Sequence, residues 1–154
     1  MRYSTNVILP GAYAAVEALD DFVATAGLDP QLLDLVRTRA SQLNGCAYCV
    51  DMHSRDLRER GESEQRVYAI AVWRETPFFT PRERAALAWT EAVTLVAGRG
   101  VSDAAYAEVR AQFEEREVAT LTLAIAAINT WNRISIASGL TPSVRQAPET
   151  AGVA

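Results

Sequence analysis

The chain lacks the features that several broad classes of protein require. Its formal net charge is −4, from 15 basic and 19 acidic residues, and the arginines form no block, which argues against a nucleic-acid-binding surface. No run of eighteen apolar residues occurs, so we expect no membrane span. Residues 1–10 lack the basic start, apolar stretch and small-residue cleavage site of a secretory signal. We therefore expect a cytoplasmic protein.

The composition is that of an ordinary globular protein. Hydrophobic residues make up 49% of the chain and charged residues 22%, which argues against wholesale disorder. A length of 154 residues is enough for one domain with a single core. We expect this domain to cover residues 1–140. Prolines and small residues recur after it, so we expect a flexible tail at 141–154.

Helix boundaries recur along the chain, whereas strand signals are nearly absent. Asp29-Pro30 is typical of a helix start, and Thr80-Pro81 with Glu83 forms a capping box. We predict an all-α domain of six or seven helices. The expected helices cover residues 11–26, 30–43, 46–61, 63–75, 80–96, 102–112 and 118–137. The last of these is apolar on nearly every face, which predicts burial inside the domain or against a partner subunit.

Two cysteines and the only histidine lie within eight positions, at Cys46, Cys49 and His53. At about 100° per residue, a helix would place Cys49 roughly 60° and His53 about 20° from Cys46. All three side chains would share one helix face, because residues three and four apart are neighbours. The spacing predicts redox or nucleophilic thiol chemistry.

The expected helix start favours that chemistry. Cys46 and Cys49 would occupy the first turn after Asn44-Gly45, where unpaired amides and the helix dipole stabilise a thiolate. His53 could accept the thiol proton, and the two cysteines could close a disulfide. In a reducing compartment, such a pair favours catalysis or metal binding over a structural staple. By position alone, either cysteine could attack first.

The cluster has two other interpretations. Two thiolates and an imidazole could bind zinc, but the chain has no further cysteine or histidine, so a carboxylate, water or another chain would be the fourth ligand. Free cysteines also pack as small hydrophobes and could be inert. Because every cysteine and the only histidine share one helix face, we favour redox catalysis, with no metal and no cofactor.

Residues 34–53, with the sequence DLVRTRASQLNGCAYCVDMH, resemble the signature of the AhpD-like alkylhydroperoxidases of the carboxymuconolactone decarboxylase superfamily. The resemblance continues at 73–79 (WRETPFF), 83–91 (ERAALAWTE) and 128–133 (INTWNR). Decarboxylases of the superfamily lack the cysteine pair, so the resemblance favours the peroxidase-like branch.

The resemblance implies an AhpD-like helical fold and a homo-oligomer, either a trimer or a hexamer. It also implies a thiol-dependent peroxidase that reduces alkyl hydroperoxides with electrons from a dithiol reductant of lipoyl or thioredoxin-like type. In the family's order of roles, Cys49 is the peroxidatic nucleophile, Cys46 resolves it, and His53 relays the proton.

Two departures from the family pattern concern the relay. The family has a glutamate twelve residues before the first cysteine, where this chain has Asp34. Asp34 is therefore the expected relay carboxylate, although it is one methylene shorter. Tyr48 stands in place of a histidine and could donate a hydrogen bond, but a phenol does not replace an imidazole as a base. Glu91 could face the dithiol, or it could serve at the surface.

The sequence leaves other functions open. The chain could be a dithiol oxidoreductase or a lactone-processing relative. It could also be a non-enzymatic helical oligomer whose dithiol senses redox state or binds zinc.

Overall fold

A computed structural model describes residues 1–145, and within that range it is helical and contains no strand. Its elements are α1 (Thr5–Ile8), α2 (Ala12–Thr25), α3 (Pro30–Asn44), α4 (Ala47–Glu59), α5 (Glu64–Ala69), the 3₁₀ helix η1 (Ile70–Glu75), α6 (Pro81–Thr94), α7 (Val96–Arg99), α8 (Asp103–Arg110) and α9 (Glu115–Ser138). The all-α prediction is confirmed.

The described part of the chain contains more helices than the six or seven that we expected. Two of them, α1 and α7, are only four residues long. In addition, the single helix expected at 63–75 divides into α5 and η1, because Val72 has non-helical angles (φ −124°, ψ 29°). Of the expected tail, residues 141–145 are not helical, and 146–154 lie outside the described residues.

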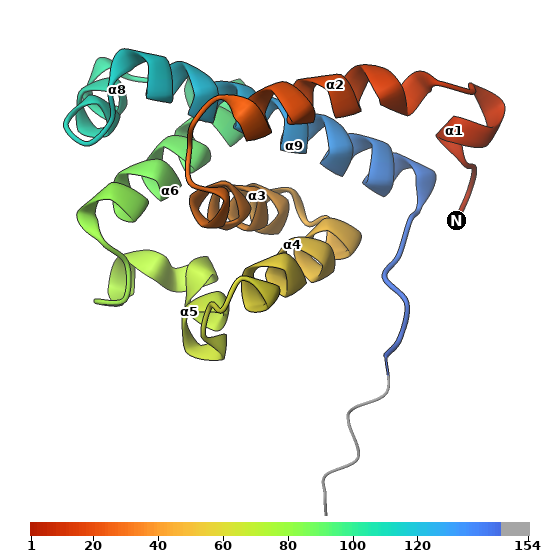
Figure 1. Ribbon diagram of the computed structural model, residues 1–154, viewed down its shortest axis with the longest axis horizontal. Helices are drawn as coiled ribbons and strands as arrows, with labels where there is room; N and C mark the ends of the chain where they lie inside the picture. The colour runs from red at the N-terminus through yellow and green to blue at the C-terminus, as the bar shows by residue number, and fades with distance from the viewer. Residues whose placement is uncertain (146–154) are drawn as a thin grey trace, which may run out of the picture.

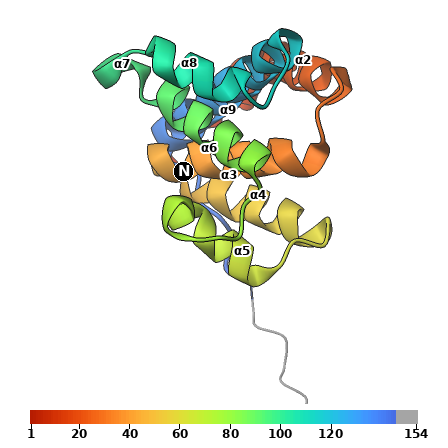
Figure 2. The ribbon, with the colours of Figure 1, turned by 90° about the vertical axis from the view of Figure 1, so that its left-hand side faces the viewer.

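Helix α3 lies at the centre of the molecule and contacts α4, α6 and α9. In Figures 1 and 2, α2 and α9 run on one side of α3, while α4 and α5 lie on the other. The contacts of α2 with α9, and of α6 with α8 and α9, complete this arrangement. The main core lies among these helices and includes the fully buried Leu57, Leu87 and Leu121.

The end of α3 sets the start of α4. The Asp29 side chain accepts a hydrogen bond from the Gln31 amide at 2.8 Å and begins α3 as expected. Gly45 ends α3 in the left-handed conformation (φ 71°), and the Cys46 amide donates to the Ser41 carbonyl at 3.0 Å. These bonds satisfy the last carbonyls of the helix and turn the chain so that α4 begins at Ala47.

The capping box expected at Thr80 is also present. The Glu83 amide donates to Thr80 Oγ1 at 3.2 Å, and the Thr80 amide donates to Glu83 Oε2 at 2.7 Å. This reciprocal pair satisfies two amides at the start of α6.

Helix α9 only partly matches the expectation of burial on every face. One broad face is buried against α2, α3 and α6. Leu123 and Ile136, however, are 36% and 43% exposed in the single chain. Within residues 1–145, none of the helices combines the length and the apolar character that a membrane crossing requires.

The turn at Gly45 provides a test of how the two helices are joined. A Cβ at Gly45 would meet nothing within 4 Å, so Gly45→Ala should cost only the left-handed backbone conformation, roughly 1–2 kcal/mol. Gly45→Asn should cost less, because asparagine tolerates that conformation. Urea denaturation of the two variants measures the difference, and equal losses would contradict a conformational cause.

Candidate active site

Cys46 and Cys49 lie at the start of α4, where they form a disulfide with their Cα atoms 5.4 Å apart. Cys46 is the N-cap residue, and its Sγ accepts a hydrogen bond from the Cys49 amide at 3.4 Å. The sulfur thus takes the place that a serine or aspartate oxygen usually has at a helix start. The predicted placement of both cysteines at the beginning of a helix is confirmed.

The disulfide belongs to a small apolar cluster that is separate from the main core. Ala40 of α3 and Ile128 of α9 pack against the two cysteines, and each cysteine is only 1% exposed. Ser135 Oγ lies 3.8 Å from Cys49 Sγ. Because a disulfide sulfur carries no proton, the serine hydroxyl is the donor in this contact.

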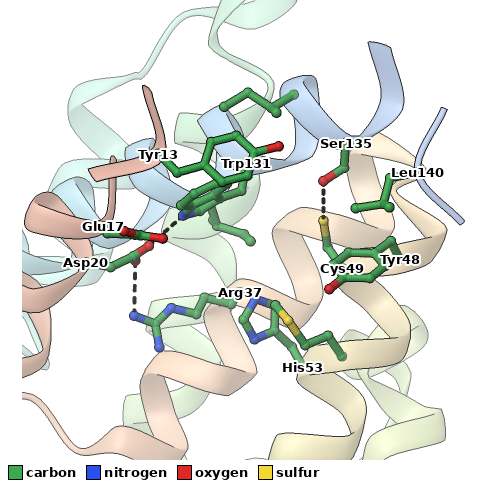
Figure 3. A pocket seen from close by; sticks show the side chains of 13 residues that line it. Tyr13, Glu17, Asp20, Arg37, Tyr48, Cys49, His53, Trp131, Ser135 and Leu140 are labelled. Carbon is green, nitrogen blue, oxygen red and sulfur yellow. Dashed lines mark hydrogen bonds and ion pairs between the residues drawn. The ribbon is translucent and has the colours of Figure 1, made fainter. Parts of the chain in front are cut away.

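A cavity of about 490 Å³ opens beside Cys49, and Figure 3 shows the side chains around it. Its lining consists of Tyr13, Glu17, Asp20, Arg37, Tyr48, Cys49, Met52, His53, Ile128, Trp131, Ile134, Ser135 and Leu140. Cys49 is part of this wall, whereas Cys46 is not. The cavity therefore gives a small molecule access to one sulfur of the pair.

The cavity lining combines apolar side chains with charged ones. Isoleucine, leucine and tryptophan side chains of α9 and the residues after it form an apolar wall. The edge of Tyr13 packs on Trp131, with 5.1 Å between ring centroids. Asp20 of α2 accepts a hydrogen bond from Trp131 Nε1 at 2.6 Å and forms an ion pair with Arg37 at 3.4 Å. These contacts tie α2, α3 and α9 together around the cavity.

His53 lines the cavity but is only 7% exposed. Its Nδ1 is buried and makes no hydrogen bond to any residue within 1–145, although Asp56 Oδ2 lies 3.3 Å away. Burial lowers the pKa of His53, and the positive charge of Arg37 lowers it further, against the opposing carboxylates of Asp34 and Asp56. A lowered pKa keeps the imidazole neutral at pH 7, as a proton acceptor must be.

The Asp34 side chain is buried and paired with two arginines. Its Oδ2 accepts a hydrogen bond from Arg60 Nε at 2.6 Å, and its Oδ1 accepts one from Arg37 Nη1 at 3.3 Å. No hydrogen bond joins Asp34 to His53 among the described residues, although an oxygen of Asp34 lies within 4.8 Å of a ring nitrogen. The structure thus brings Asp34 near the histidine but pairs it with guanidinium groups.

The structure places the two other candidate residues differently. Tyr48 lines the cavity next to Cys49. Glu91 is absent from its lining and instead accepts hydrogen bonds from Arg39, Arg74 and Trp73 Nε1 at 2.7 to 2.8 Å. Three donors on other elements draw the carboxylate toward η1, and this explains why Glu91 does not face the dithiol.

Among the residues that the structure describes, one group of side chains has donor atoms close enough for a metal ion. Ligand atoms of Asp34, His53 and Asp56 lie within 4.8 Å of one another. Both oxygens of Asp34 already accept hydrogen bonds from arginines, so a cation would have to displace a guanidinium group. The donor set therefore fits ion pairing better than metal binding.

Several residues that shape the site did not stand out in the sequence. Asn44 Nδ2 donates to Asn129 Oδ1 and Asn132 Oδ1 at 2.9 and 2.8 Å, and Asn132 Nδ2 donates to Ser41 Oγ at 3.0 Å. This network joins the end of α3 to α9 directly before the turn into α4. Asn129 and Asn132 lie in the matching segment 128–133, but their partners are more than 80 residues away.

Known proteins resemble the chain along most of its length. The model of the carboxymuconolactone decarboxylase family matches residues 10–92. The uncharacterized protein YdfG of Bacillus subtilis is 39% identical over 138 residues, 90% of this chain and 94% of that protein. A shorter segment of 47 residues, 30% of this chain, is 45% identical to the alkyl hydroperoxide reductase AhpD of Solibacter usitatus, of which it covers 27%.

The fold also matches a crystal structure. That crystal structure is of a protein of unknown function from Agrobacterium tumefaciens, which has been suggested to be the antioxidant defence protein AhpD. The two share 43% sequence identity and a TM-score of 0.91 over 94% of this chain and 99% of that chain. The predicted AhpD-like fold is therefore confirmed.

The lowered pKa of His53 predicts a pH-dependent stability. As the pH falls below the ordinary histidine pKa of 6.5, the unfolded chain binds a proton that the folded protein does not. The free energy of unfolding should then decrease, by at most about 1.4 kcal/mol per pH unit, until the pH reaches the folded pKa. Above pH 6.5 this contribution should be constant.

Urea denaturation between pH 7.5 and 5 would measure this dependence in the wild type and in His53→Gln. Because the chain has a single histidine, its proton NMR titration also gives the folded pKa directly. A folded pKa at or above the ordinary value, or the same slope in both proteins, would contradict the prediction.

Proposed function

Since this chain belongs to the carboxymuconolactone decarboxylase family, we propose that it is a thiol-dependent peroxidase that reduces organic hydroperoxides through Cys46 and Cys49. The observation that carries the proposal is the unequal placement of the two sulfurs. Cys49 and His53 both line the cavity, whereas Cys46 lies outside the lining at disulfide distance from Cys49. One sulfur can therefore meet a substrate while the other is in place to resolve it.

The first step is attack by Cys49 in the reduced protein. Neutral His53 accepts the thiol proton, and the thiolate attacks the outer oxygen of the hydroperoxide. An S–O bond forms as the O–O bond breaks, which leaves Cys49 as a sulfenic acid. The departing alkoxide takes up the proton held by His53 and leaves as the alcohol.

The second and third steps close the cycle. The Cys46 thiol attacks the sulfenic sulfur of Cys49, so that an S–S bond forms and water leaves. A dithiol reductant, of lipoyl or thioredoxin-like type, then reduces this disulfide by thiol–disulfide exchange. The two thiols of the reductant become a disulfide, and both cysteines regain their protons.

Access to the cavity supports the order of roles that the family resemblance implies. A thioredoxin-like order would have Cys46 attack first, but this residue does not line the cavity. Its sulfur also caps α4. Cys49 is the sulfur that a substrate in the cavity can reach, so we assign it as the nucleophile and Cys46 as the resolving thiol.

The walls of the cavity support an organic rather than an inorganic peroxide. Ile128, Trp131, Ile134 and Leu140 offer apolar contacts that hydrogen peroxide cannot use, whereas an alkyl or aryl group would bury surface there. We propose substrates of this class for the enzyme.

The same proposal includes the cellular location and the oligomeric state of the enzyme. A reducing cytoplasm would maintain the dithiol reductant. A homo-oligomer, as a trimer or hexamer, stays a prediction for this chain, and the exposed Leu123 and Ile136 of α9 are apolar side chains that a second copy could cover.

A single-turnover experiment tests the peroxidase cycle. Reduced protein freed of reductant without air should lose two thiols and about two mass units with one equivalent of cumene hydroperoxide. The reaction should be faster than that of free dithiothreitol. Cys49→Ser should lose the reaction, whereas Cys46→Ser should accumulate a sulfenic acid that dimedone traps.

Two outcomes would count against this cycle. Thiols that persist at the dithiothreitol rate in the wild type would point instead to a dithiol oxidoreductase with another substrate. A sulfenic acid in Cys49→Ser, with none in Cys46→Ser, would reverse the two roles.

Substrate preference offers a separate prediction about the apolar wall. We expect the wild type to react faster with cumene hydroperoxide than with hydrogen peroxide. Ile134→Ser should slow the organic substrate about tenfold and leave hydrogen peroxide unaffected. Val96→Ser is the matched control, because Val96 lies outside the cavity lining and is 52% exposed. Equal effects of the two substitutions would contradict binding at this wall.

A further inference from the structure

One nitrogen of the His53 ring, Nδ1, is buried without a hydrogen-bond partner among the described residues. A buried nitrogen that lacks a hydrogen bond costs free energy. Asp56 Oδ2 is 3.3 Å from Nδ1, within ion-pair distance. The Asp56 side chain is 33% exposed, so it has room to rotate toward the ring. Catalytic hydrogen bonds often tighten in this way only when substrate binds.

The expected relay carboxylate is poorly placed to serve this nitrogen. Each oxygen of Asp34 accepts a hydrogen bond from a guanidinium group, one from Arg60 and one from Arg37. The same side chain is only 3% exposed, so it cannot leave these partners without burying unpaired charges. Arg37 is held in turn by Asp20. The carboxylate on α3 is thus fixed by its arginines.

We propose that Asp56, rather than Asp34, is the positioning carboxylate that orients His53 and stabilises its protonated form. The inference rests on the proposed peroxidase function for its catalytic meaning, but the contact itself does not depend on any substrate. Asp34 then has a different task, which is to hold Arg37 and Arg60 in place beside the histidine.

The proposed contact assigns a role to each ring nitrogen. Nδ1–H donates to Asp56, so the lone pair is on Nε2, and this nitrogen accepts the proton of Cys49. Which nitrogen carries the proton is set by the hydrogen bond that the other makes. The imidazolium then lies against the Asp56 carboxylate until its Nε2 proton passes to the departing alkoxide. No group is oxidised or reduced in this transfer.

The charges around His53 make such a partner necessary. From α3, Asp34 and Arg37 face the ring, with Arg60 beyond Asp34; from α4, Asp56 faces it. The negative charge of Asp34 is offset by its two arginines, and Arg37 opposes a positive charge on the ring. Within residues 1–145, the ion pair of Asp56 is with His53 and none is with an arginine, although its negative charge also acts on Arg60.

The helix itself maintains the pair. Asp56 follows His53 by three residues on α4, so the two side chains are neighbours on the helix surface. Both move together with Cys49, which lies one turn before the histidine on α4. A carboxylate on another helix would depend on the packing between helices for the same distance.

The single histidine allows the contact to be tested by NMR on the oxidised protein, without substrate. In the wild type, ¹⁵N shifts should show neutral His53 as the Nδ1–H tautomer. Asp56→Asn should lower the His53 pKa by at least about 0.5 unit, and Asp56→Ala should abolish the tautomer preference. Glu59→Gln is the matched control: it removes the same charge on the same helix, but its side chain is 70% exposed and pairs with Arg55.

Activity provides a second readout. In the reduced protein, Asp56→Asn should slow thiol loss with cumene hydroperoxide and change its pH profile, and Asp56→Glu should restore part of the rate. A wild-type tautomer and pKa in both Asp56→Asn and Asp56→Ala would overturn the proposal, as would an equal pKa shift in Glu59→Gln. The Asp56 variants could change the tautomer and pKa of His53 while the wild type shows no reaction with hydroperoxides. That result would refute the peroxidase function and support the positioning contact.

Discussion

The hydrogen bonds of the Asn44 side chain hold the site together. Asn44 lies at the end of α3 and donates to Asn129 and Asn132 of α9. Because Asn132 is fully buried, losing this contact would leave a polar group unpaired, at a cost of about 1–3 kcal/mol. The next residue, Gly45, turns the chain. These contacts with α9, and not the loop alone, therefore fix the position of α4 and the direction in which Cys49 faces.

The elements that the sequence predicted are those whose determinants are local. The start of α3 at Asp29 and the capping box at Thr80 follow from neighbouring residues, and both lie where the pattern indicated. The division of the expected helix at 63–75 was not predictable in this way. There, Ile70 and Trp73 are both buried, and a 3₁₀ helix aligns residues three apart. The helix therefore divides because of packing in the core, and not because of a glycine or proline in the chain.

The same distinction applies to the site. Two cysteines and a histidine at helical spacing could be placed together from the sequence, because one helix carries them all. The pairing of Asp34 with Arg60 could not, since Arg60 is 26 residues away and approaches only when α4 packs on α3. A family motif indicates where a carboxylate stands, but the arginines around it decide what the carboxylate can do. The substitution of aspartate for glutamate occurs at just such a position.

The sulfur of Cys46 is part of the disulfide and also caps the first turn of α4, where it accepts a hydrogen bond from the Cys49 amide. A negatively charged sulfur accepts a hydrogen bond more strongly than a neutral one and is further favoured by the helix dipole. Whatever stabilises the charged, reduced sulfur makes the disulfide a stronger oxidant. Oxidation state and helix initiation are therefore thermodynamically coupled, and residues that fix the beginning of α4 also tune the reduction potential of the pair.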